Sequence, residues 1–278
     1  MKMTHEFIQA AGREIHFTQW GHEHRDAVVL WHGLVRTGRD FDALAGHLAA
    51  RYRVLCPDTL GRGLSQWAVD KSQEYTYPFY GKIVAELLER LNLRTVRWLG
   101  TSMGGLLGIY LASGPLKGRI TQLLLNDIGP DVPAPALKRI FDYVGHPREF
   151  DTLAGYEQWL RQIYATFGAL TDATWRHLAV TSHRRTDDGR VTVHYDPQVL
   201  QGFTSGAGQA DLWAAYDAVP CPTLVIRGAA SDVLAAGTAE EMTRRGPRAA
   251  LRLVADCGHA PLLDVPDQMA LVTGFFNG

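Results

Sequence analysis

The sequence predicts an α/β protein in which a mostly parallel sheet carries helices on both faces. Short apolar runs alternate with segments of helical periodicity along most of the chain, the pattern of strands joined by crossover helices. This alternation is interrupted once, by a proline-rich exit and a mainly helical stretch. A G-x-S-x-G pentapeptide also lies between a predicted strand and a predicted helix.

The composition excludes several classes of protein. The 278 residues are 46% hydrophobic and 21% charged, with 28 Lys and Arg against 29 Asp and Glu, so disorder is excluded. A net charge of −1 predicts no binding of nucleic acid. The three cysteines are widely spaced, and the N-terminus lacks an apolar segment of signal-peptide length. We therefore expect a reduced, cytoplasmic protein.

The first part of the chain predicts six strands and the helices between them. Residues 6–10 and 14–19 form a hairpin around the Ala11-Gly12 turn. The apolar runs that follow are short and rich in β-branched and large side chains, as in strands buried on both faces. These strands span 28–31, 52–56, 96–99 and 120–125, and the helices 41–50, 77–91 and 103–112.

The alternation stops after Asp127, where Pro130, Pro133 and Pro135 make a stiff exit. We predict an inserted, mainly helical cap over residues 131–219, with amphipathic faces at 137–144 and 156–167, a short strand at 190–195 and a helix at 211–216. The sheet resumes with strands at 223–226 and 251–254 and helices at 238–245 and 266–276. The catalytic core then comprises residues 1–130 and 220–278.

One stretch, residues 98–116, contains no charged residue over nearly the length of a membrane span. It also holds five glycines, at 100, 104, 105, 108 and 114, gathered around Ser102. A buried strand, a tight turn and a buried helix explain this composition better than a lipid-spanning helix. We expect no membrane span.

Ser102 is the candidate nucleophile. In Gly100-Thr101-Ser102-Met103-Gly104 the serine turns the chain from strand to helix in a strained conformation that exposes its Oγ. The positions two before and two after it approach too closely for a Cβ, so both are small. The position between strand and helix makes the motif specific.

His259 is the candidate base, because a hydroxyl needs a group that accepts its proton. Among 11 histidines, it follows the last predicted strand in a turn-rich loop at the same sheet edge as Ser102. We predict that Asp232, after strand 223–226, orients His259, which gives the chain order Ser, Asp, His. Asp127, after strand 120–125, is the alternative acid.

An acyl transfer also needs donors for the developing oxyanion. The backbone N–H groups of Leu34, in the His32-Gly33-Leu34 loop, and of Met103 are the candidates. His32 is expected to brace that loop. A substrate pocket is predicted from four aromatic residues, which could also serve only packing: Trp159, Tyr164, Phe167 and Trp213.

The sequence indicates no metal site and no cofactor. The glycine-rich loop from Asp58 to Ser65 follows a strand, but it lacks the Gly-Lys-Ser/Thr of a P-loop, and the chain has no G-x-G-x-x-G.

Taken together, these motifs resemble those of the α/β-hydrolase superfamily over essentially the whole chain. They are His32-Gly33, the loop Asp58…Gly61-Arg62-Gly63…Ser65, Gly100-Thr101-Ser102-Met103-Gly104-Gly105 and Cys257-Gly258-His259-Ala260-Pro261. The resemblance implies an eight-stranded sheet with the cap inserted after strand six. It is greatest to capped bacterial carboxylesterases, some relatives of which hydrolyse polyesters such as polylactic acid.

The predicted function is therefore hydrolysis of small carboxylic esters, with a polyester as one option, through an acyl-enzyme. Lactone, C–C or perhydrolase chemistry on the same triad is the alternative, although Ala260 departs from the Trp usual after the histidine of C–C hydrolases. A ligand receptor on the hydrolase scaffold is a further alternative, which the complete set of motifs argues against. The oligomeric state is left open.

Overall fold

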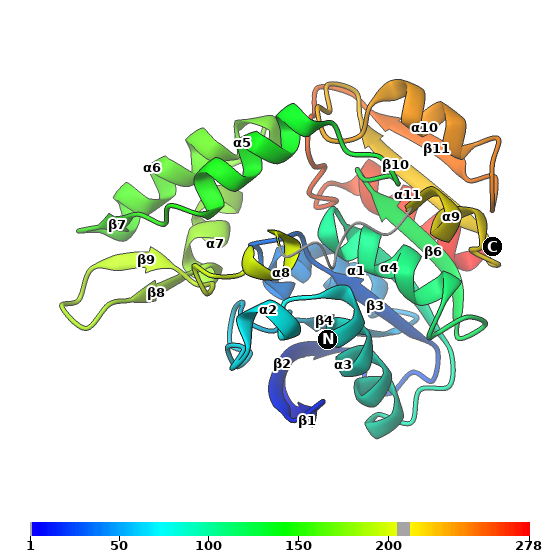
Figure 1. Cartoon of the computed structure of the whole chain (residues 1–278), viewed down its shortest axis with the longest axis horizontal. Helices are drawn as coiled ribbons and strands as arrows, with labels where there is room; N and C mark the ends of the chain where they lie inside the picture. The colour runs from blue at the N-terminus through cyan, green and yellow to red at the C-terminus, as the bar shows by residue number, and fades with distance from the viewer. Residues whose placement is uncertain (1, 205–211) are drawn as a thin grey trace.

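The computed structural model describes residues 2–204 and 212–278, and its centre is a sheet of eight strands (Figure 1). The spatial order is β1-β2-β4-β3-β5-β6-β10-β11; β1 and β2 are antiparallel, as are β2 and β4, and the remaining neighbours are parallel. This confirms the predicted fold class. The strands span Thr4–Ala10, Arg13–Trp20, Ala27–Trp31, Arg53–Pro57, Val96–Thr101, Ile120–Asn126, Thr223–Gly228 and Ala250–Val254 for β1, β2, β3, β4, β5, β6, β10 and β11.

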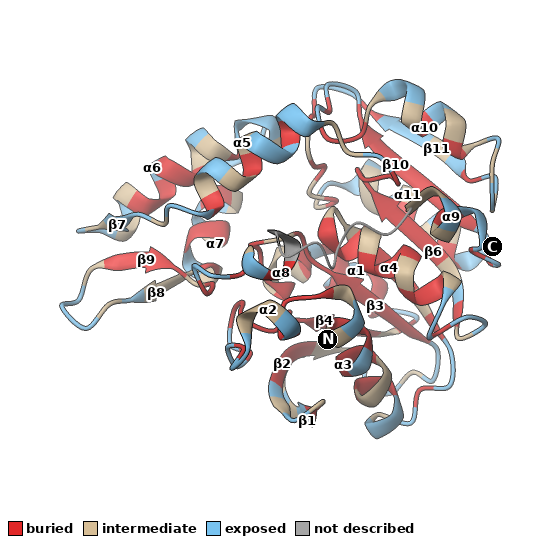
Figure 2. Cartoon of the chain, viewed as in Figure 1, coloured by how far each residue is buried: buried red, intermediate tan, exposed pale blue. Residues whose placement is uncertain are grey.

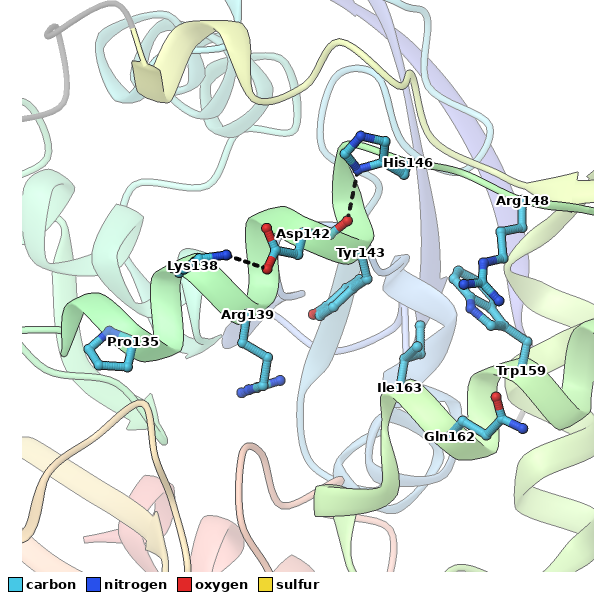
Figure 3. A pocket seen from close by; sticks show the side chains of 10 residues that line it. All are labelled: Pro135, Lys138, Arg139, Asp142, Tyr143, His146, Arg148, Trp159, Gln162 and Ile163. Carbon is cyan, nitrogen blue, oxygen red and sulfur yellow. Dashed lines mark hydrogen bonds and ion pairs between the residues drawn. The ribbon is translucent and has the colours of Figure 1, made fainter.

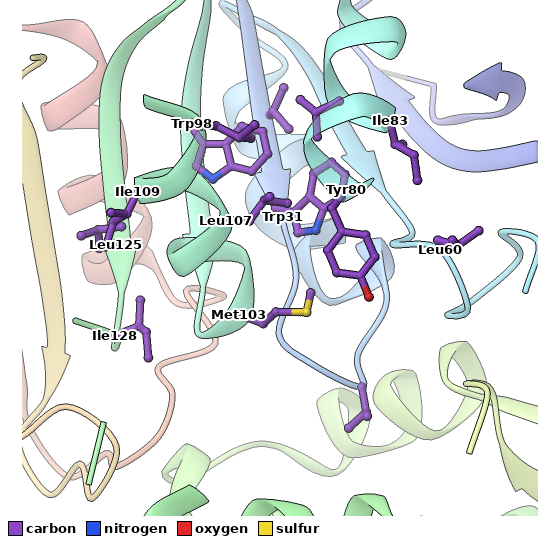
Figure 4. Close-up of a cluster of buried hydrophobic side chains, with 14 of the residues drawn as sticks. Trp31, Leu60, Tyr80, Ile83, Trp98, Met103, Leu107, Ile109, Leu125 and Ile128 are labelled. Carbon is purple, nitrogen blue, oxygen red and sulfur yellow. The ribbon is translucent and has the colours of Figure 1, made fainter. Parts of the chain in front are cut away.

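The parallel strands at the centre are buried on both faces because helices cover both (Figure 2). Along β3, Val29 and Trp31 pack into one hydrophobic cluster, and Val28 and Leu30 into the other. This alternation follows from the two-residue period of a strand. In the first cluster, Trp31 stacks on Trp98 of β5 with 5.2 Å between ring centroids (Figure 4).

The helices are divided between these two clusters. Helices α3 (Tyr77–Arg90), α4 (Met103–Ser113) and α9 (Leu212–Asp217) contribute to the first, and α1 (Asp42–Leu48) and α11 (Pro266–Asn277) to the second. Helix α10 (Ala236–Met242) is joined to α9 by the Tyr216 hydroxyl, which donates to the Met242 carbonyl. The short α2 (Lys71–Glu74) precedes α3. The predicted uncharged stretch is β5 and α4.

The segment after β6 leaves the sheet and forms a lobe beside it (Figure 1). It contains α5 (Ala134–Val144), α6 (Leu153–Ile163), the turn η2 (Ala165–Phe167), α7 (Asp172–Thr181), α8 (Gln201–Thr204) and a small sheet of order β7-β9-β8. These three strands are Glu149–Phe150, Val191–Val193 and His183–Arg185. The predicted strand at 190–195 corresponds to β9, whereas β7, β8 and α7 were not predicted; β7 and β8, of two and three residues, are too short to show a periodicity.

Helix α9 was predicted to start at residue 211, which lies outside the described residues. It packs against α4, so the last helix of the predicted insertion belongs to the layer over the main sheet. Across residues 2–204 and 212–278, we find no helix that combines the length and apolarity needed to cross a membrane.

Candidate active site

Ser102 lies in the turn between β5 and α4 at the carboxyl edge of the sheet. Its backbone has φ 52° and ψ −118°, a conformation that costs energy for a residue with a side chain. The turn is compact, because a Cβ on Gly100 would collide with the Gly104 backbone, and one on Gly104 would collide with the Trp31 carbonyl. The surrounding glycines therefore allow the strand and helix to close around the serine.

His259 reaches Ser102 from the loop after β11. Its Nε2 lies 3.0 Å from Ser102 Oγ. The loop is held in place by the Asn126 side-chain amide, which donates to the Pro261 carbonyl at 2.8 Å. From the lobe, the Thr166 hydroxyl donates to the His259 carbonyl at 2.7 Å. The sheet edge and the lobe therefore both hold the imidazole beside the serine.

Asp127, directly after β6, is the carboxylate that contacts His259. Its Oδ2 lies 2.8 Å from His259 Nδ1, and its side chain is completely buried. The Gly228 amide donates to its Oδ1 at 2.8 Å, and the Ser231 hydroxyl donates to its Oδ2 at 2.6 Å. Because an ionised carboxylate only accepts hydrogen bonds, the imidazole proton is on Nδ1, and Nε2 is free to accept the Ser102 proton.

The prediction that Asp232 orients His259 is wrong. Asp232 lies on the surface, where both its oxygens accept from the guanidinium of Arg139 on α5, at 2.8 and 3.0 Å. Ser231, its neighbour, is the residue of this loop that turns inward, towards Asp127. Asp127 was the alternative acid in the sequence analysis. Both acids follow adjacent strands, so the sequence alone could not show which of the two loops turns its acid towards His259.

The loop after β3 brings Leu34 to the other side of Ser102. Leu34 and Met103 line the same cavity as Ser102, and the Met103 N–H lies in the first turn of α4, where no intrahelical acceptor exists. His32 is fully buried and bonded at both ring nitrogens, to the Gly33 carbonyl at 2.6 Å and to the Thr59 amide at 2.9 Å. These contacts correspond to the bracing expected of His32.

Two small cavities meet at Ser102. One, of about 90 Å³, is almost wholly apolar and includes Leu34, Met103, Leu106, Ile128, Val132, Ile140 and Phe141. The other, of about 50 Å³, includes His259, Arg36, Arg139, Tyr143, Ile163, Tyr164 and Phe167. The serine therefore has an apolar cavity on the side of Met103 and a mixed cavity on the side of His259.

The four predicted pocket residues separate in the structure. Tyr164 and Phe167 line the His259-side cavity and stack on each other with centroids 4.7 Å apart. Trp159 lies on α6, where it packs against Phe150 and lines a larger neighbouring cavity. Trp213 lies on α9 beneath the Arg245 guanidinium, 4.4 Å from the ring centroid, and away from Ser102.

Two arginines in the His259-side cavity were not singled out from the sequence. Arg36 is buried and paired with Asp40 at 2.6 Å, and its guanidinium lies over the Tyr164 ring. Although burial alone would lower the pKa of Arg36, the Asp40 carboxylate raises it above the usual range. Arg139 comes from α5 and is paired with Asp232. An isolated arginine carries no sequence signal that distinguishes these roles from surface ones.

Comparison with known proteins finds a family model and relatives that match most of the chain. The model of the Alpha/beta hydrolase family matches residues 28–271. A 3-hydroxybutyrate-oligomer hydrolase of Cupriavidus necator is 42% identical over 272 residues, covering 94% of this chain and 92% of that protein. A pimeloyl-[acyl-carrier protein] methyl ester esterase of Nitrosomonas europaea is 28% identical, covering 87% and 91% of the two chains.

Among solved structures, an alpha/beta hydrolase from Novosphingobium aromaticivorans superimposes with a TM-score of 0.89. It is 33% identical to this chain, and the match covers 99% of this chain and 98% of that one. These three relatives are hydrolases, and the names of the first two give a 3-hydroxybutyrate oligomer and a methyl ester as what they act on.

Proposed function

Since the chain belongs to the alpha/beta hydrolase family, we propose that it is a serine esterase that works through an acyl-enzyme. The observation that carries the proposal is the continuous hydrogen-bonded chain from Ser102 Oγ through both nitrogens of His259 to Asp127. A serine, a histidine and a buried carboxylate in this order make a nucleophile, a general base and the group that stabilises the charged base.

In the proposed first step, His259 Nε2 takes the Ser102 proton while Oγ attacks the ester carbonyl carbon. Asp127 stabilises the imidazolium that forms. The imidazolium then gives the proton to the alcohol oxygen as the carbon–oxygen bond breaks, which releases the alcohol and leaves the acyl group on Ser102. A water molecule then gives a proton to His259 as its oxygen attacks the acyl carbon, and the imidazolium returns that proton to Ser102 Oγ as the bond between Oγ and the acyl carbon breaks, which releases the carboxylic acid.

The backbone N–H groups of Leu34 and Met103 are the proposed oxyanion donors. Their two segments flank Ser102: a Cβ on Gly33 would lie 3.7 Å from the Ser102 Cβ, and Met103 follows it in the chain. Backbone donors of this kind are preorganised, and loss of one side-chain donor in other enzymes costs about 3–4 kcal/mol of transition-state stabilisation.

We further propose that the lobe of α5, α6, α7 and α8 covers the site as a substrate-selecting cap, and that α9 belongs with the core of residues 1–130 and 220–278. The contact between Thr166 and the His259 loop and the pairing of Arg139 with Asp232 support this arrangement.

For substrates we propose short linear oligoesters of hydroxy acids. The 42% identity to a 3-hydroxybutyrate-oligomer hydrolase over nearly the full length of both chains supports this class.

The direct test replaces Ser102 by Ala and measures hydrolysis of p-nitrophenyl butanoate. We expect turnover to fall by about 10⁴-fold or more, because no nucleophile remains, with an unchanged circular dichroism spectrum. A fluorophosphonate probe should label the wild type but not Ser102→Ala. Turnover by the folded variant at the wild-type rate would overturn the assignment.

A further inference from the structure

A large cavity opens between α5 and α6, next to the candidate active site (Figure 3). Its volume is about 580 Å³, far larger than either cavity at Ser102. The charged side chains in its wall are Lys138, Arg139, Arg148 and Asp142, three cations against one anion. We call it the basic cavity.

The basic cavity adjoins the cavity on the His259 side of Ser102. Three residues, Arg139, Tyr143 and Ile163, line both the basic cavity and the smaller cavity that contains Ser102 and His259. Figure 3 shows the side chains of Tyr143 and Ile163 between the two helices. A group bound beside His259 therefore shares its cavity with Arg139, and the basic cavity lies directly behind these three side chains.

The position of His259 assigns the two halves of an ester to the two sides. In the proposed mechanism His259 protonates the departing oxygen, so the alcohol half must lie on the side of His259. The apolar cavity is lined by Met103, a proposed oxyanion donor, and suits the acyl half. The alcohol half therefore points towards the basic cavity.

The cations of the basic cavity differ in how far their charge is already neutralised. Lys138 pairs with Asp142 at 2.9 Å, and Arg139 uses its Nε and one Nη2 hydrogen on Asp232. Within residues 2–204 and 212–278, the Arg148 guanidinium forms no ion pair, although it lies in the wall of the basic cavity. Arg139 also keeps its Nη1 donors for a ligand.

We propose that a carboxylate carried by the alcohol half of the substrate binds where the two cavities meet, through the remaining Nη1 donors of Arg139, while Arg148 adds positive charge at the far end of the basic cavity. The leaving alcohol is then a hydroxycarboxylate, as at the carboxyl end of a linear oligoester of hydroxy acids. During the reaction this carboxylate stays ionised and bound, and only the ester bond at Ser102 is broken. The inference rests on the proposed function. It adds that the oligoester is cleaved at the ester bond nearest its carboxyl end.

The test compares two esters that differ only in charge: β-butanoyloxybutyrate and its primary amide, both with butanoate as the acyl half. We expect kcat/KM of the wild type to favour the carboxylate by about tenfold or more, since a charge-assisted hydrogen bond to arginine is lost in the amide. Arg139→Gln should reduce this ratio to about threefold or less, whereas Asp232→Asn, which removes only the partner of Arg139, should leave the ratio at or above its wild-type value. The ratio is taken within one sample, so a loss of folded protein cancels.

Arg185→Gln is the matched control. Arg185 lies on β8 of the same lobe, is exposed and is not part of the cavity wall, so the charge removed is the same and the ratio should keep its wild-type value. Monoethyl glutarate and its primary amide place the carboxylate on the acyl half instead, and no preference for the acid is expected.

Three results would overturn the proposal: a wild-type ratio near one, an unchanged ratio in Arg139→Gln, or a preference for the carboxylate only on the acyl half. Each leaves the proposed esterase function intact as long as p-nitrophenyl butanoate is hydrolysed. Absence of all ester hydrolysis by the wild type would instead overturn the proposed function itself.

Discussion

Asp127 is the residue whose position most changes the chemistry expected of this chain. It accepts hydrogen bonds from the Gly228 amide, Ser231 and His259. These three donors replace the hydrogen bonds to water that the carboxylate loses on burial. Asp232, which comes after β10, is instead exposed and paired with Arg139. The candidate acid of the site therefore follows β6, and the loop after β10 contributes Ser231, whose hydroxyl donates a hydrogen bond to it.

We expect Asp127→Asn to lower kcat for p-nitrophenyl butanoate by about 10³–10⁴-fold, because the amide can neither fix the imidazole tautomer nor stabilise the imidazolium. Asp232→Asn should change kcat by less than about tenfold, since its carboxylate does not contact His259. Thermal melts of both variants check that they fold. A larger loss in Asp232→Asn than in Asp127→Asn would contradict the assignment.

At the scale of elements, the junction of β5 and α4 determines where the nucleophile lies. The backbones of β3, β5 and α4 approach so closely here that Gly100 and Gly104 have no room for a side chain. The same contact holds the helix start, and with it the Met103 N–H, beside Ser102. The close packing of β3, β5 and α4 at this junction therefore also fixes the positions of Ser102 and the Met103 N–H.

Gly104→Ala should destabilise the fold by about 3 kcal/mol or more, because the new methyl group would overlap the Trp31 and His32 carbonyls, and backbone cannot move aside cheaply. Denaturant unfolding measures the loss. The control is Gly274→Ala in α11, where the space around the Cβ is open and the helix should gain about 0.5–1 kcal/mol. Equal effects at the two glycines would show that close packing is not the cause.

For the whole molecule, the buried His32 links stability to pH. Burial lowers the pKa of His32 to about 4, and the Thr59 amide already occupies the Nε2 lone pair that a second proton would need. The pKa of a histidine in the unfolded chain is about 6.5. At pH values between about 4 and 6.5, His32 therefore binds a proton in the unfolded chain but not in the folded one. The free energy of unfolding therefore falls as pH drops through this window.

The pH effect of His32 should be about 3 kcal/mol between pH 6.5 and pH 4. His32→Gln lacks the ionisation, so we expect the stability difference between wild type and variant to shrink by this amount as pH falls, after a constant offset above pH 7. Urea titrations at several pH values measure it. Parallel stability curves for the two proteins would rule out His32 as the source.

Local patterns were sufficient for much of this structure. All eight strands of the main sheet were predicted within a few residues. The central parallel strands are short apolar runs between turns, and the antiparallel β1 and β2 show alternation on either side of the Ala11-Gly12 turn. The turn at Ser102 was predicted for a related reason. Only glycine fits at positions 100 and 104, so a few adjacent residues are enough to identify the turn. His259 was predicted because it follows the last strand, and the loop after that strand lies at the same edge of the sheet as Ser102.

Only the tertiary structure could decide between Asp127 and Asp232, or show that Arg36 and Arg139 face the site while Trp213 does not. These residues lie on loops and helices whose direction depends on contacts between segments far apart in the chain. Ser231 rather than Asp232 turns inward because Asp127 and Arg139, from other elements, bind them on opposite sides. The sequence by itself thus determined the fold class and the serine and histidine of the site, whereas packing between distant segments selected the acid and the charges around them.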